Sequence, residues 1–192
     1  VTYNVGNSDD NDFTFEGTIS ERGGSNNTAF NKVGKCKMTF KGSGSFTGAC
    51  KVSAGELALN SNATTAMLGT GALTVAKDAI LSGRGVLGNS SVTVSTGGTL
   101  RSGVTETNSV GNLQFSGKNV TVSGTMQTYI SSKSSYSKFT KMGTLKLNGT
   151  LRVIVKADAD LPEGTELQII SADKITLGST LKLDLDPAYE WD

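Results

Sequence analysis

The sequence contains no histidine. Histidine is the most frequent general base and a common zinc ligand, so its absence excludes Ser-His-Asp and Cys-His nucleophiles and imidazole zinc sites. The chain has only two cysteines and two prolines in 192 residues, and aromatic residues make up 6%. Two thiols are too few to hold a metal ion. We therefore expect no metal, no cofactor and no catalytic residues.

The sequence also lacks an excess of one charge and a long apolar run. The formal net charge is +1. Lysines are scattered among acids, so the basic stripe that a nucleic-acid interface requires is missing. No apolar run reaches the length of a transmembrane helix, and no signal peptide is visible. Because the chain begins at Val1 without Met, we expect a mature or excised fragment, with any membrane attachment carried by other domains.

What the sequence has in quantity is short β-type runs separated by Gly and Ser. Within Phe30–Asn60 the runs Lys37–Phe40, Lys51–Ala54 and Glu56–Leu59 alternate with such turns. The pattern continues through Leu73–Leu100, with glycines between the runs. Runs this short cannot bury a face alone, so they must stack on neighbouring copies of themselves. The sequence predicts an all-β fold, a β-solenoid.

The C-terminal third has longer aliphatic runs. Leu145–Val155 and Leu167–Leu185 are separated by a turn that contains Pro162. Solenoids need terminal caps because their end coils expose unpaired strand edges, so we expect a C-terminal β cap. The predicted divisions are an N-terminal lead-in and first rung (1–29), β-helix repeats (30–155) and cap strands (156–192).

The order of these runs resembles the passenger-associated β-strand repeat of bacterial autotransporters. The matching positions in this sequence are Lys32-Val33-Gly34, Met38, Phe40, Gly42, Phe46-Thr47-Gly48 and Val52-Ser53-Ala54-Gly55-Glu56-Leu57. The segment Gly71–Gly103 and the aliphatic tail are similar to the parts that follow in such passengers, so the resemblance covers most of residues 30–185. Cys36 and Cys50 depart from the repeat, which has small polar residues or Gly there.

This resemblance implies a single-stranded right-handed parallel β-helix with a C-terminal cap. It also implies a bacterial protein that is extracellular or on the cell surface and serves as a non-catalytic structural or adhesive segment. A second reading is a carbohydrate-binding accessory module of a larger polysaccharide-processing protein, whose partner is a host or environmental glycan. The third is a β-helical polysaccharide lyase or hydrolase, which the absence of histidine disfavours. The sequence sets neither the ligand nor the oligomeric state.

Cys36 and Cys50 each open the same local pattern, CKMTF and CKVSA. If these strands stack in register on adjacent rungs, about 4.8 Å apart, the two Cα atoms fall within reach of a disulfide. Export from the cell would favour oxidation. The alternative is a pair of buried free thiols that act as small core residues.

Tyr129 and Tyr136 are the candidate glycan contacts, because sugar sites use exposed aromatic faces beside polar groups. They flank the serine-rich segment Ser131–Lys138, which we expect to be an exposed loop. The alternative is that Tyr129 packs on a rung. Tyr189 and Trp191 close the chain, and we expect them to cover the last strand.

Other motifs have plain structural readings. The G-x-G-x-x-G at Gly83–Gly88 lacks the following helix that a dinucleotide site requires, so these are turn glycines. Asp9, Asp10 and Asp12 lack the ligand spacing of a Ca²⁺ loop. A carboxylate pair for glycoside hydrolysis would meet only in the fold. Its candidates, with two basic residues that a lyase would need, are Glu16, Glu21, Glu56, Asp78, Glu106, Arg84 and Arg101.

Overall fold

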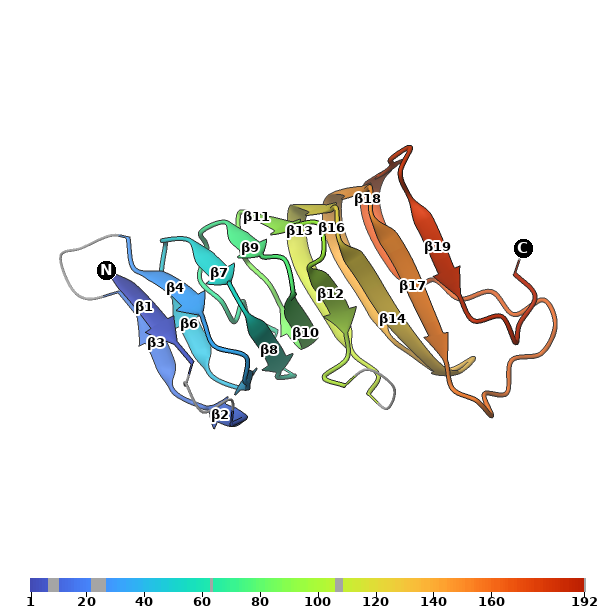
Figure 1. Cartoon of the computed structure of the whole chain (residues 1–192), viewed down its shortest axis with the longest axis horizontal. Helices are drawn as coiled ribbons and strands as arrows, with labels where there is room; N and C mark the ends of the chain where they lie inside the picture. Colours follow the sequence, from blue (N-terminus) through green and yellow to red (C-terminus); the bar gives the residue numbers. More distant parts are fainter. Residues whose placement is uncertain (7–10, 22–26, 63, 106–108, 192) are drawn as a thin grey trace.

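A computed structural model of the whole chain describes residues 1–6, 11–21, 27–62, 64–105 and 109–191 (Figure 1). These residues form strands and turns, and they contain no helix. The strands are β1 (Thr2–Val5), β2 (Phe13–Phe15), β3 (Thr18–Ser20), β4 (Ala29–Lys32), β5 (Lys37–Phe40), β6 (Ser43–Ser45), β7 (Cys50–Val52), β8 (Gly55–Asn60), β9 (Leu73–Val75), β10 (Ala79–Val86), β11 (Ser91–Val94), β12 (Thr99–Ser102), β13 (Asn112–Val122), β14 (Thr125–Ser132), β15 (Ser135–Tyr136), β16 (Lys138–Leu147), β17 (Thr150–Val155), β18 (Ile170–Leu177) and β19 (Lys182–Leu185).

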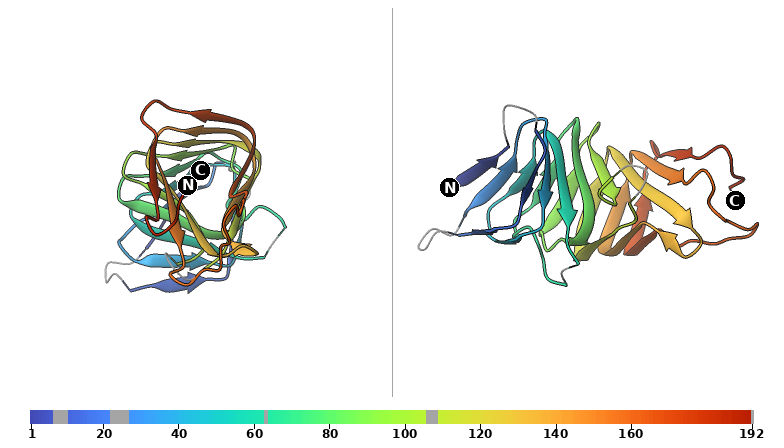
Figure 2. Two further views of the ribbon diagram at one scale, coloured as in Figure 1. Left: turned by 90° about the vertical axis from the view of Figure 1, so that its right-hand side faces the viewer. Right: turned by 90° about the horizontal axis from the view of Figure 1, so that it is seen from below.

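Nearly all strand pairs are parallel, and they form ladders that run the length of the molecule. The first ladder joins β1, β4, β7, β9, β11, β13, β16 and β18. The second joins β2, β5, β8, β10, β12, β14, β17 and β19. A third, less regular ladder contains β3 and β6 and later the ends of β10, β13 and β16. The chain therefore winds in stacked coils around one axis, which is consistent with a β-solenoid (Figure 2).

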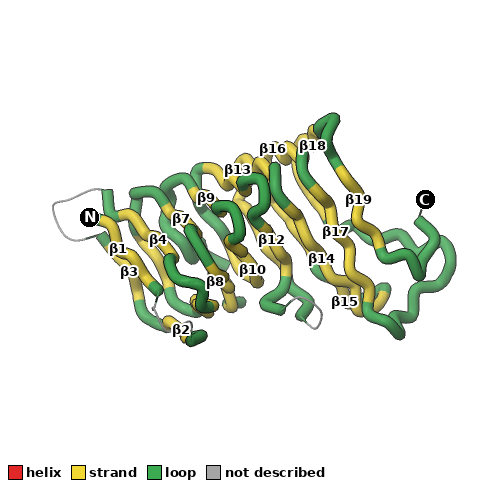
Figure 3. The backbone as a smooth tube through the Cα atoms, in the orientation of Figure 1, coloured by secondary structure: helices red, strands yellow, loops and turns green. Residues whose placement is uncertain are grey.

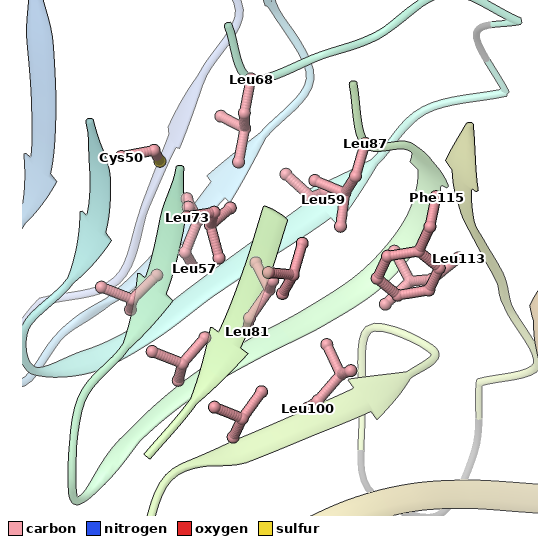
Figure 4. Close-up of a cluster of buried hydrophobic side chains, with 14 of the residues drawn as sticks. Cys50, Leu57, Leu59, Leu68, Leu73, Leu81, Leu87, Leu100, Leu113 and Phe115 are labelled. Carbon is pink, nitrogen blue, oxygen red and sulfur yellow. The ribbon is translucent and has the colours of Figure 1, made fainter. Parts of the chain in front are cut away.

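The interior is filled by side chains that repeat at one register position in successive coils. In the first ladder one such column is Phe30, Cys50, Leu73, Val92, Val120 and Leu145. In the second ladder another is Met38, Leu57, Leu81, Leu100 and Met126. All of these side chains are at most 1% exposed, and Figure 4 shows several of them pointing into the same interior. Burial of each large aliphatic side chain is worth about 1.5–3 kcal/mol.

One charged residue stands in a column of valines. Lys32 pairs with Val5 on one side and Val52 on the other, and it is fully buried. Its ammonium donates hydrogen bonds to the carbonyl oxygens of Val33 (2.9 Å), Gly34 (3.0 Å) and Ala54 (3.2 Å). An ammonium has three donors, so every one of them has an acceptor. Lys32 thus ties together the corners of two successive coils.

The last strands continue the ladders. β18 pairs with β16, and β19 pairs with β17, both in parallel. Ile175, Leu177 and Leu183 continue interior columns. No further coil of the described residues stacks on them, so they are 48%, 61% and 61% exposed. Loops beyond β17 and β19 extend from this end (Figure 3). The ladders cross both boundaries of the predicted three-part division without a break. The division itself stays a prediction.

Candidate functional site

An open cleft of about 430 Å³ lies where the second ladder turns into the third. Its polar lining comes from four segments of the chain: the residues just after β8, strand β10, the start of β13, and β15 with the start of β16. The lining residues used below are Arg84, Asn112, Gln114, Tyr136 and Lys138.

Three of these side chains lie on successive coils. Arg84 pairs with Asn60 of the coil before it. The next residue, Gly85, pairs with Leu113, which places Arg84 beside Asn112. Asn112 pairs in turn with Lys138. Neighbouring parallel strands lie about 4.8 Å apart, so the backbones of Arg84 and Lys138 lie two strand spacings from each other.

Two glycines set the position of Arg84. Gly83 and Gly85 have φ values of 116° and 138°, which ordinary side chains rarely adopt. A Cβ on Gly83 would lie 1.9 Å from the carbonyl oxygen of Leu59, and one on Gly85 would lie 2.5 Å from the Met67 sulfur. The chain can therefore bend at this corner and present Arg84, which is exposed. Both glycines lie within strand β10, so the prediction of turn glycines is wrong for these two. The described residues after β10 form loop and strand rather than the helix of a dinucleotide site.

Arg84 and Lys138 are each held by a neighbour. The Arg84 Nε donates to the Asn60 side-chain oxygen at 3.0 Å. The Lys138 ammonium lies 4.3 Å from the centroid of the Tyr136 ring, a cation–π contact that draws the charge toward the ring. Tyr136 itself packs against the apolar cluster that contains Ile130 and Val153. Contacts with neighbouring side chains thus hold Arg84, Lys138 and Tyr136 in place in the cleft.

The two tyrosines predicted to contact a glycan have different environments. The segment Ser131–Lys138, predicted to be an exposed loop, is mostly strand: it includes the end of β14, all of β15 and the start of β16, and only its residues 133 and 134 form the turn of the antiparallel β14–β15 hairpin. Tyr136 lines the cleft and is half-buried. Tyr129 lies in β14 and is only 4% exposed, so it has the packing position that the alternative reading gave it and offers no face to a sugar.

A buried hydroxyl network supports the floor of the cleft. Ser102 Oγ lies 2.7 Å from the Gly111 carbonyl oxygen and 2.8 Å from that of Lys138. Thr128 Oγ1 donates to the Ser137 carbonyl oxygen at 2.9 Å, and Ser137 Oγ accepts from the Gly111 amide at 3.2 Å. Ser102, Thr128 and Ser137 are fully buried. Because these bonds join three coils, they hold the backbone on both sides of Lys138 in place.

A second polar cluster surrounds Glu56 on the outer side of the second ladder. Its Oε1 accepts from Arg101 at 2.7 Å and from Ser82 at 2.6 Å, and it lies 3.2 Å from the Lys37 ammonium. Lys37 also donates to the carbonyl oxygen of Val104, which lies shortly after β12. The Glu56 and Arg101 side chains are only 14% and 8% exposed. This carboxylate is occupied by donors from three strands, so its evident role is to join them.

The other described carboxylates proposed for catalysis lie apart from Glu56. Glu16 forms an exposed ion pair with Lys41 at 3.1 Å. Glu21 accepts hydrogen bonds from the Thr47 hydroxyl and from its backbone N–H, and these bonds lower the pKa of Glu21. Asp78 occupies a turn with a positive φ of 61°. Sequence reasoning placed all of these on strands or turns but could not show which acid would meet a base.

Glu106, Asp9 and Asp10 lie outside the described residues. Asp12 accepts a hydrogen bond from the Lys37 backbone N–H at 2.8 Å, which joins the first coil to the second. Within the described ranges no three acidic, cysteine or histidine side chains gather in a way that would hold a metal ion.

The predicted register of the two cysteines is wrong. Cys50 begins β7 in the first ladder, where it pairs with Phe30 and Leu73. Cys36 comes directly before β5 in the second ladder, so the two similar patterns lie on different faces of the coil rather than on top of each other. Both thiols are buried and free. Burial raises the pKa of the Cys50 thiol to about 12.

Comparison with known proteins adds no family. No protein-family model matches the chain, and no curated protein matches it. Where the structure describes the chain, it has no helix with the length and apolar character needed to cross a membrane.

Proposed function

We propose that this chain is a non-catalytic structural or adhesive segment of a secreted or cell-surface bacterial protein, of the kind found in autotransporter passengers. The observation that carries the proposal is the pair of continuous parallel ladders from β1 and β2 to β18 and β19. Each coil packs on the next through backbone hydrogen bonds and apolar columns, so the fold extends along one axis as coils are added. Such a stack suits extension and display.

The proposed architecture is a single-stranded right-handed parallel β-helix with a C-terminal cap. The right hand is inferred because connections between parallel strands of one sheet are right-handed in about 98% of cases. The cap is inferred from the segment after β17: Leu161, Leu167 and Tyr189 pack against the Ile130–Val153–Val155 cluster at one corner of the last coils. Tyr189 and Trp191 also contact each other edge to face, with ring centroids 6.4 Å apart.

Labelling of intact native cells tests this proposal. An antibody raised against residues 1–192 should label unbroken cells or the culture medium, and externally added protease should remove the cell-bound signal. Antibody fragments that cover the chain should also reduce attachment of the cells to their natural surface. Labelling that requires cell lysis would overturn the surface role, and unchanged attachment would leave extension and display as the function.

A carbohydrate-binding accessory role is the second candidate, and the cleft favours it. Tyr136, Arg84 and Asn112 bring an aromatic wall, a cation and an amide to one concave surface, which is the composition of a polar ligand site. Glycan binding that is lost in Tyr136→Ala and kept in Tyr3→Ala, which alters an exposed tyrosine on β1, would support this role.

A further inference from the structure

We propose that the cleft binds an oligosaccharide with repeated carboxylate groups, such as a uronic acid chain, and that Arg84 and Lys138 each bind one carboxylate. The proposal rests on the carbohydrate-binding role above. Among the described residues that line the cleft, Arg84 and Lys138 are cationic and none is acidic. An anionic ligand would therefore meet two positive charges on entering the cleft.

The spacing of the cations favours a repeating ligand. Arg84 lies on the coil of β10 and Lys138 on the coil of β16, with Asn112 of β13 between them. Their backbones lie two strand spacings apart, about 10 Å. The Arg84 guanidinium is also held by Asn60 of the preceding coil, on the side away from Lys138, so while these contacts are kept one carboxylate does not reach both cations at hydrogen-bond distance. Carboxylates on different sugar units of one chain can, if the chain lies along the solenoid axis.

Each cation keeps donors for a ligand. Arg84 uses Nε for Asn60, and its two terminal nitrogens retain N–H groups in the fork that matches a carboxylate. The Tyr136 ring holds the Lys138 ammonium by its charge. Since this contact uses no hydrogen bond, and none joins the ammonium to another described residue, its three donors can serve oxygen acceptors of a ligand.

The amide between the cations can serve sugar hydroxyls. The Asn112 side-chain oxygen accepts a hydrogen bond from the Thr140 hydroxyl at 2.8 Å. That bond orients the amide and leaves its NH₂ group as a donor. Gln114 adds a second amide two residues further along β13. The cleft thus has donors for acidic groups at both ends and for neutral oxygens in the middle.

Calorimetric titration with a short oligogalacturonate, and with its methyl-esterified form, tests the proposal. The ester removes the charges and keeps the sugar chain. We expect the acidic form to bind, the ester to bind at least about 10-fold more weakly, and Arg84→Gln and Lys138→Gln each to weaken binding by about 10- to 100-fold, since hydrogen bonds to charged groups are this strong. Added salt should weaken binding of the acidic form, and Lys138→Arg should restore most of it.

Lys146→Gln is the matched control, because Lys146 is an exposed lysine on the same strand as Lys138 but away from the cleft. It should bind the oligogalacturonate like the unaltered chain. Equal affinity for the ester and the acid, or an equal loss in Lys146→Gln, would overturn the anionic proposal and leave a neutral-glycan role standing. Failure of both forms to bind the unaltered, folded chain would overturn the proposal, and failure to bind neutral glycans as well would overturn the carbohydrate-binding role.

Discussion

At the scale of single residues, the buried charges of Lys32 and Glu56 are met by polar partners, although the Nε of Arg101 beside Glu56 has none among the described residues. Lys32 replaces an aliphatic side chain in an interior column, and its ammonium donates three hydrogen bonds to backbone carbonyl oxygens at the corners of the coils. Glu56 lies on the outer side of a ladder, where its carboxylate forms ion pairs with Arg101 and Lys37 and accepts a hydrogen bond from Ser82. In both cases the residue joins different coils of the solenoid. We expect each of them to fix the register between coils as well as to contribute to stability.

Glu56→Gln should lower the free energy of unfolding by about 3 kcal/mol, because it leaves the buried Arg101 guanidinium without its counter-charge. Urea titration followed by circular dichroism measures the change. Glu16→Gln is the control: its ion pair with Lys41 is 70% and 45% exposed on the two sides, so its loss should cost less than about 1 kcal/mol. Equal effects of the two substitutions would contradict the role given to Glu56.

The Cys50 thiol should make the fold sensitive to alkali. The unfolded chain releases this proton near pH 9.0, whereas the folded chain retains it until about pH 12. The unfolded state binds fewer protons in that interval, so the free energy of unfolding is unaffected by Cys50 below pH 9.0 and falls as pH rises toward 12, by up to about 1.4 kcal/mol per pH unit.

Urea titrations of the unaltered chain and of Cys50→Ala between pH 8 and 11 measure this effect. The variant should begin less stable, because it leaves a small cavity, and should then lose less stability with rising pH. Parallel curves would show that Cys50 ionises equally in both states. A thiol reagent should also label both cysteines only after unfolding, since both are buried.

At the scale of elements, the sequence predicts the strands better than it predicts their places. The run Lys37–Phe40 is strand β5 as expected, and Glu56–Leu59 lies within β8. Alternation of apolar residues is the same on every face of a coil, however, so it could not show that Cys36 and Cys50 belong to different ladders. Coils also differ in length, which is why the alignment of Arg84 with Lys138 became visible only in the register of the folded chain.

Glycines determine where a strand can bend from one ladder into the next. We therefore expect Gly83→Ala to destabilise the fold strongly. The added Cβ would meet the Leu59 carbonyl oxygen at 1.9 Å, and the φ of 116° would be strained as well. We expect a loss above about 3 kcal/mol. Gly117→Ala is the control, because its φ is also positive but nothing lies within 4 Å of a Cβ there; it should cost about 1 kcal/mol. Thermal and urea unfolding compare the two, and equal losses would mean that φ strain alone governs these corners.

At the scale of the whole molecule, the middle of each interior column is better covered than its two ends. Each ladder consists of backbone bonds between coils, so the middle coils are paired on two sides and the terminal coils on one. The large apolar side chains that remain exposed among the described residues are Val1, Tyr3, Ile175, Leu177, Leu183 and Trp191, all in the first or last coil or in the segment after it. Stability should therefore be greatest in the middle and fall toward both ends.

A single column provides the comparison, because Leu100 and Leu183 occupy equivalent positions in the second ladder through Met126 and Leu151. Leu100 is fully buried, whereas Leu183 is 61% exposed. Leu100→Ala should lower the free energy of unfolding by about 2–5 kcal/mol, and Leu183→Ala by less than about 1 kcal/mol. Hydrogen exchange should show the same order, with β12 amides protected longer than those of β19. Comparable losses at the two positions would mean that the last coil is as well packed as the centre, which would require an apolar partner, either a second copy or another protein segment, seated on Leu183 in solution.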